Sequence, residues 1–138
     1  MKATVRWVDG AMFEATADTG HTVVMDGAPE IGGRNRGSRP MEVVLMGAGG
    51  CSAADVISIL AKARQEVTDC VVELEAERAE AVPRVFTRIH LHYVVTGRGL
   101  KPAAVERAVG LSADKYCSAM QMLNKTAAVT HDFELREA

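Results

Sequence analysis

The segment Val43–Ala54 contains no charged residue and lies within a longer helical pattern, from about Pro40 to Gln65. Most surface helices have a polar face, and a helix that is apolar all round has to be buried on all sides. A chain of 138 residues cannot easily surround one helix completely. A homodimer that encloses the helix between two copies is the most economical solution, and a fully buried helix in a monomer is the alternative.

Three glycines interrupt this predicted helix, in the stretch MGAGGCSAAD. Each glycine inside a helix costs about 1 kcal/mol relative to alanine. Gly47, Gly49 and Gly50 would allow another backbone to approach closely, which agrees with the predicted dimer. Cys51 follows the last of them directly and would lie in the apolar crevice that they leave.

The other patterns predict an α+β protein, with strands and helices in separate blocks of the chain. Alternation of apolar and polar residues marks the strands, and capping and breaking residues limit the helices. The expected strands are Ala3–Val8, Phe13–Ala17, His21–Asp26, Cys70–Arg78, Arg84–Thr96 and Thr130–Glu137. The later helices are expected over Lys101–Val109, stopped by Gly110, and over Ala113–Val129, with Ser112 as the N-cap. No linker or repeat is visible, so residues 1–138 are expected to form one domain.

The charge balance argues against nucleic acid or an anionic membrane as a partner, because 16 basic and 18 acidic residues give a net charge of −2. The longest uncharged apolar run is shorter than the ~20 residues that span a bilayer, and the first residues show no signal-peptide pattern. We therefore expect a cytoplasmic protein without a membrane span, in which cysteines are kept reduced.

Two of the three cysteines share a local context, because Cys51 and Cys117 are each followed by serine and alanine. On two core helices they could form an attacking and resolving pair, if their Cα atoms lie within ~4.4–6.8 Å. The alternative is that each is a small buried apolar residue. Cys70 begins a strand without an evident partner and is interpreted as incidental.

A reactive Cys51 would need a nearby cation to lower the pKa of its thiol. The loop before the helix could supply one, since it carries Arg34, Arg36 and Arg39. A solvated surface loop is the alternative interpretation of these arginines.

His90 and His92 lie on one face of a predicted strand, but no third and fourth ligand has a workable spacing. The sequence contains no Walker, dinucleotide or Ser-His-Asp motif either. We therefore predict neither a bound metal nor a cofactor.

Two segments resemble the OsmC/Ohr family of osmotically inducible and organic hydroperoxide resistance proteins: RPMEVVLMGAGGCSAADV and LSADKYCSAMQML. The resemblance covers essentially the whole chain and is strongest to the small YhfA-like branch. It implies an OsmC-like fold, in which antiparallel sheets pack on two long core helices of an intertwined homodimer.

The resemblance also implies a thiol-dependent peroxidase that acts in oxidative stress defence. In such a protein the Cys51 thiolate would attack an organic hydroperoxide and become a sulfenic acid. Cys117 would then form a disulfide with it, and a dithiol such as a lipoyl group would reduce that disulfide. No cofactor or metal is implied.

The peroxidases of the family pair an arginine from the early hairpin with a glutamate directly after the proline that opens the helix. Here Met41 follows Pro40, and Glu42 is the candidate for the acidic catalytic position. The range 8–32 contains no arginine or lysine. An alternative function is therefore a non-enzymatic dimer that binds a small apolar or thiol ligand at its interface. A third is metal or sulfur handling by Cys51 together with a histidine.

Overall fold

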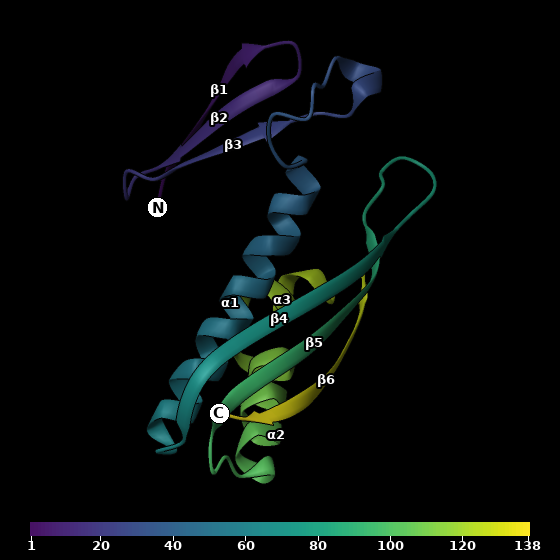
Figure 1. Ribbon diagram of the computed structural model, residues 1–138. Helices are drawn as coiled ribbons and strands as arrows, with labels where there is room; N and C mark the ends of the chain where they lie inside the picture. Colours follow the sequence, from purple (N-terminus) through teal and green to yellow (C-terminus); the bar gives the residue numbers. More distant parts are fainter. The chain divides into compact units, whose positions relative to one another are not determined.

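Two three-stranded sheets and one long helix dominate the protein (Figure 1). The computed structural model describes all residues 1–138, which divide into two compact units, Met1–Met46 and Gly47–Ala138. The expectation that the chain forms one domain stays a prediction.

The first unit contains the antiparallel meander that its alternating sequence predicts. Its strands are β1 (Ala3–Asp9), β2 (Met12–Ala17) and β3 (Thr22–Asp26), in the order β1-β2-β3. The register places six apolar residues on one face: Val5, Trp7, Phe13, Ala15, Val23 and Met25. Three of them are largely uncovered, since Val5 is 58%, Trp7 64% and Val23 46% exposed. This apolar face of the N-terminal sheet therefore lacks a covering layer within its own unit, Met1–Met46.

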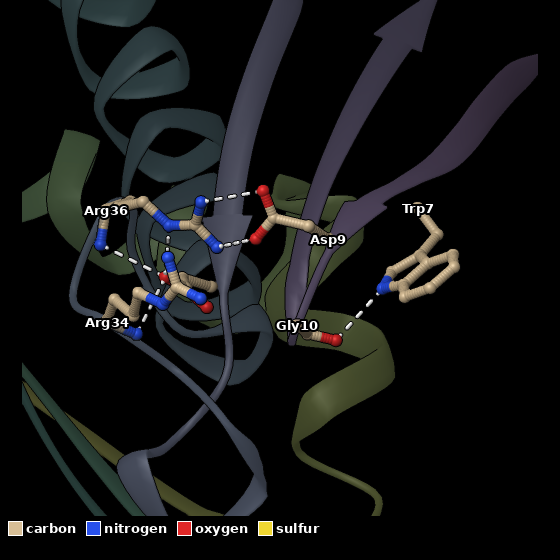
Figure 2. A network of polar contacts seen from close by, with 6 residues as sticks. Trp7, Asp9, Gly10, Arg34 and Arg36 are labelled. Atoms are coloured by element: carbon tan, nitrogen blue, oxygen red, sulfur yellow. Dashed lines mark hydrogen bonds and ion pairs between the residues drawn. The ribbon is translucent and has the colours of Figure 1, made fainter.

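The buried carboxylate of Asp26 organises the loop that follows β3. Figure 2 shows Arg34 and Arg36 of this loop, with the Arg36 guanidinium directed at Asp9. Its Oδ2 atom accepts hydrogen bonds from the backbone N–H groups of Arg34, at 3.0 Å, and Arg36, at 3.2 Å. The Arg36 guanidinium contacts the same oxygen at 3.3 Å and also donates to both carboxylate oxygens of Asp9, at 2.6 and 3.1 Å. The Arg34 N–H contributes most to lowering the pKa of Asp26. The loop is thus tied back to the sheet by charge-assisted hydrogen bonds.

The helix α1 (Pro40–Lys62) begins at the predicted proline. The backbone N–H of Arg39 donates to Glu42 Oε1 at 2.7 Å, an arrangement that satisfies one of the free donors at a helix start. Its buried residues recur at helical spacing and form one stripe: Ala48, Gly49, Ser52, Val56 and Leu60. A Cβ atom on Gly49 would come within 2.6 Å of Leu74, so this glycine allows the helix to pack closely on the second sheet.

The second sheet, in the order β4-β5-β6, belongs to the unit Gly47–Ala138. Its strands are β4 (Glu66–Arg78), β5 (Phe86–Arg98) and β6 (Ala128–Glu137). The predicted hairpin of β4 and β5 is present, with Leu74 opposite Leu91. Alternate residues of β5 are fully buried: Ile89, Leu91, Tyr93 and Val95.

The last strand differs from the prediction, because β6 pairs parallel with β5. The expectation of antiparallel sheets is wrong for this pair. The chain between the two strands forms helices that cross over one face of the sheet (Figure 1) and bring it back in the same direction. Parallel neighbours require such a crossover, whereas antiparallel neighbours can be joined by a short turn.

The second helical region is broken into three pieces, so the prediction of a second long helix is wrong. The helix α2 (Pro102–Leu111) continues through Gly110 and passes into a π turn, η2 (Ser112–Tyr116). The helix α3 (Ser118–Leu123) begins only after it. Cys117, in an extended conformation, is the N-cap of α3, a position that was predicted for Ser112 in a longer helix.

Candidate functional site

The thiol of Cys117 is fully buried at the junction of the π turn and α3. Its backbone N–H donates to the carbonyl of Ser112 at 2.9 Å, which closes the π turn. The sulfur accepts a hydrogen bond from the Met120 N–H at 3.4 Å and donates to the Ala48 carbonyl of α1 at 3.9 Å. The turn therefore directs this thiol toward α1.

The thiol of Cys51, also on α1 and one turn after Ala48, is near enough to that of Cys117 to influence its pKa. Cys51 is half-buried, and both cysteines are free thiols in the structure. Burial is the largest effect on the Cys117 thiol and raises its pKa to about 11. The hydrogen bond from the Met120 N–H lowers this pKa, and the neighbouring Cys51 thiol raises it. Cys117 is consequently a protonated thiol at neutral pH. The structure thus brings together the two cysteines that the sequence singled out.

Three buried hydroxyl groups lie beside this pair, and we call Ser52, Tyr93 and Ser112 the hydroxyl cluster. All three residues are fully buried. The Oγ atom of Ser52 lies 2.5 Å from Tyr93 Oη and 2.7 Å from Ser112 Oγ. The Ser112 Oγ atom also lies 3.1 Å from the Ser52 carbonyl and 3.2 Å from Asp55 Oδ2, and each of these oxygens can accept its one hydroxyl hydrogen.

The hydroxyl cluster was not predicted from the sequence. A serine inside an apolar helix was a signal, because buried hydroxyls need hydrogen-bond partners. The partners themselves come from β5 and from the π turn, and Ser52 is 41 residues from Tyr93 and 60 from Ser112. No local pattern connects such distant positions.

The family model for OsmC-like proteins matches residues 33–132, which include both cysteines and the hydroxyl cluster. The chain belongs to the OsmC-like family. This OsmC-like protein is 53% identical to Protein YhfA of Escherichia coli strain K12 over 135 residues, 98% of each chain. The predicted family membership and α+β fold are confirmed.

Solved structures of the OsmC-like fold agree with this assignment. A hypothetical protein of Aquifex aeolicus VF5 is 29% identical, with a TM-score of 0.87 over 99% of this chain and 96% of that chain. The organic hydroperoxide resistance protein OhrB of Bacillus subtilis has a TM-score of 0.62 over 96% of each chain. OhrB is only 19% identical, so this likeness concerns the fold alone.

The remaining predicted site residues of the OsmC-like protein have other contacts. Glu42 accepts the hydrogen bond from Arg39 at the start of α1, and Arg36 is bound by Asp9 and Asp26. Cys70 lies on β4 opposite Val95, where burial raises its pKa. The catalytic role of Glu42 and the loop arginines as a cation source stay predictions.

By length and composition α1 could cross a membrane, since an 18-residue window has a mean hydropathy of 1.8. A single helix of this kind is weak evidence, because the core helix of a soluble protein meets the same criteria. In this OsmC-like protein the buried stripe of α1 includes Gly49, which packs against Leu74 of β4.

The two predicted strand histidines lie on the outer face of β5, beside carboxylates of β6. His92 Nδ1 lies 2.7 Å and His90 Nε2 3.1 Å from Asp132 Oδ1, and His92 Nε2 lies 3.4 Å from Glu134. Hydrogen bonding to Asp132 is the largest effect that raises the pKa of His92, and the same bond lowers the pKa of Asp132. Glu73 is opposite His92 on β4.

The substitution Asp132→Asn is expected to lower the pKa of His92 toward the usual 6.5. Folding raises the pKa of His92 and lowers that of Asp132, so their pairing stabilises the fold most where the aspartate is ionised and the histidine is protonated. This pH range lies above the ordinary pKa of aspartate and below that of histidine. The stability lost in the variant should therefore be largest near pH ~5.5 and should vanish as the pH rises through the folded pKa of His92.

NMR titration of the His92 ring and urea unfolding at pH 5.5 and 8 measure these effects. The control is Asp114→Asn, which removes a contact of His131 and should leave the His92 titration unchanged. An unchanged His92 pKa in Asp132→Asn would contradict the assigned pairing.

Proposed function

We propose that this OsmC-like protein reduces organic hydroperoxides with thiols, with Cys51 attacking and Cys117 resolving, in the defence against oxidative stress. The placement of the two thiols carries the proposal: the fully buried Cys117 Sγ lies 3.9 Å from the Ala48 carbonyl of α1, one helical turn before the half-buried Cys51. Cys51 is the more accessible of the two thiols, which suits the attacking role. The raised pKa of Cys117 keeps its thiol protonated, which suits a residue that reacts only in the second step. Membership of the OsmC-like family supports the choice of organic hydroperoxides as the substrate class. A cytoplasmic location would keep both thiols reduced.

In the first step the Cys51 thiolate attacks the terminal oxygen of the hydroperoxide. The S–O bond forms as the O–O bond breaks, and the alkoxide takes a proton and leaves as the alcohol. Cys51 is oxidised to a sulfenic acid, and the peroxide is reduced by two electrons.

In the second step the Cys117 sulfur attacks the sulfenic sulfur of Cys51. The S–S bond forms, and the hydroxide that leaves takes the Cys117 proton and becomes water. An external dithiol then reduces the disulfide by thiol–disulfide exchange and is itself oxidised to a disulfide. The protein returns to its starting state with two free thiols.

The assay follows the loss of cumene hydroperoxide, supplied with dihydrolipoamide as the dithiol. We expect multiple turnovers of peroxide per protein, and slower turnover with a monothiol at equal thiol concentration. Peroxide loss at the background rate with every reductant would refute the proposed function.

The proposed active form is a homodimer, because one chain leaves apolar surface uncovered. Val44, Met46 and Ile57 of α1 are exposed, and nothing lies within 4 Å of a Cβ atom built on Gly47 or Gly50. The apolar face of the N-terminal sheet is uncovered too. Apolar surface of this kind marks a protein interface. Light scattering at micromolar concentration should give the mass of two chains, and the mass of one chain would contradict the proposal.

The alternative function is a non-enzymatic dimer that binds a small apolar or thiol ligand at its interface. Within one chain, a cavity of about 560 Å³ offers room for such a ligand. Its lining combines apolar Ile59 and Leu111 with two cations, Lys62 and Arg107, and one carboxylate, Asp55. This composition suits a small ligand with an apolar body and an anionic group. The alternative fails if the protein turns over hydroperoxide and iodoacetamide modifies Cys51 much faster than a model thiol at pH 7.

A further inference from the structure

We propose that the hydroxyl cluster is a positioning device for the resolving thiol: Ser52, Tyr93 and Ser112 hold the π turn against α1 so that Cys117 meets Cys51. This inference rests on the proposed function, because it assigns the cluster to the disulfide-forming step. The three hydroxyl groups form no hydrogen bond with either cysteine sulfur. They act through the backbone that carries the two cysteines.

The connection between the cluster and the cysteines is short on both sides. On α1, Ser52 is the residue that follows Cys51. On the π turn, Ser112 accepts the Cys117 N–H with its carbonyl, at 2.9 Å, and meets Ser52 with its hydroxyl, at 2.7 Å. The hydrogen bond between Ser52 and Ser112 therefore links the two cysteine-bearing segments directly. Ser52 is next to Cys51, and Ser112 closes the π turn that leads to Cys117.

The hydrogen bonds of the cluster have one consistent direction. Burial raises the pKa of Tyr93 to about 12, so its phenol is protonated and can donate. Ser112 donates toward the Asp55 carboxylate, and Ser52 must then donate to Ser112 and accept from Tyr93. Every hydroxyl of the cluster has a partner, and the chain of donors ends at a carboxylate of α1.

A purely structural role explains the polar character of the cluster poorly. Alanine would fill a serine position in the core without burying a hydroxyl group, and buried hydroxyls contribute little net stability even when they are paired. A fully paired buried network instead selects one arrangement of the elements that it joins. Disulfide formation needs that precision, because the Cβ atoms have to lie about 3.5–4.5 Å apart.

The experiment uses the full-length variant Ser112→Ala in single turnover. One equivalent of cumene hydroperoxide is added, and intact-mass spectrometry with dimedone trapping follows the Cys51 sulfenic acid and the disulfide separately. We expect sulfenic acid to form at the wild-type rate within about twofold, and the disulfide to form at least ~10-fold more slowly, since a misplacement near 1 Å can cost up to ~100-fold.

Two further variants separate positioning from general loss of structure. Ser112→Thr keeps the hydroxyl and should restore most of the disulfide rate. Ser118→Ala removes an exposed serine beside Cys117 and should leave both rates unchanged. If Ser112→Ala does not fold, Tyr93→Phe removes one hydroxyl, keeps the ring, and should slow the second step alone.

A second measurement does not depend on peroxide chemistry. In a glutathione redox buffer, the equilibrium between the dithiol and the Cys51–Cys117 disulfide should shift toward the dithiol in Ser112→Ala by about 10-fold or more. If the wild type does not reduce hydroperoxide but the equilibrium shifts in Ser112→Ala, the proposed function fails and the positioning role holds. Wild-type disulfide rates and equilibria in Ser112→Ala and Tyr93→Phe would overturn the inference.

Discussion

Replacing Cys51 by serine is expected to lower hydroperoxide consumption to the background rate, a loss of about a hundredfold or more. A serine hydroxyl is not ionised at neutral pH and is a far poorer nucleophile toward oxygen than a thiolate. Its hydroxyl group is nearly isosteric with the thiol, so the α1 helix and the contact with Cys117 should persist. Peroxide loss with dihydrolipoamide measures the effect, and circular dichroism verifies the fold.

The partner variant Cys117→Ser should separate the two chemical steps. Cys51 remains able to reduce one equivalent of peroxide, but its sulfenic acid has no thiol to condense with and should accumulate for trapping by dimedone. The matched control is Cys70→Ser, which removes a thiol on β4 and should leave turnover unchanged. Full turnover in Cys51→Ser, or its loss in Cys70→Ser, would refute the assignment of the cysteines.

Replacing Leu91 by alanine is expected to reduce the free energy of unfolding by about 2–5 kcal/mol. Leu91 is fully buried in the middle of β5, opposite Leu74 on one side and His131 on the other. The surrounding strands and helices cannot collapse fully into the space that the leucine leaves, so a cavity cost adds to the lost burial.

Urea unfolding at fixed protein concentration measures this loss, and the concentration is fixed because the protein is proposed to form a dimer. The control Met122→Ala truncates a residue that is 69% exposed, and its effect should stay within about 0.5 kcal/mol. Equal effects of the two substitutions would contradict the position of β5 at the centre of the core.

Much of the architecture followed from local rules. Period-two alternation identified the N-terminal meander and the hairpin of β4 and β5, because a half-buried strand needs one apolar face. Pro40 marked the start of α1, and its run without charges predicted a helix that needs covering on several sides. Two motifs on two core segments also singled out Cys51 and Cys117, and their roles as an attacking and resolving pair stay a prediction.

The errors lie where distant segments decide the outcome. Gly110 was expected to end a helix, but α2 continues through it and unwinds into a π turn only where Ser112 reaches Ser52. Glycine costs a helix about 1 kcal/mol relative to alanine, which is less than the free energy that the tertiary contacts of such a segment contribute. The parallel pairing of β6 likewise depends on where the helical crossover leads, and no pattern inside β6 reports it.

The sequence by itself determined the family, the α+β class, the apolar helix and the two cysteines, because each depends on residues that are close together in the chain. Only the tertiary structure decided that Cys117 is a buried helix cap directed at α1, and that Ser52, Tyr93 and Ser112 share one hydrogen-bonded cluster. These hydrogen bonds join residues that are 41 to 69 positions apart. Their geometry depends on packing between α1, β5 and the π turn, which no local periodicity encodes.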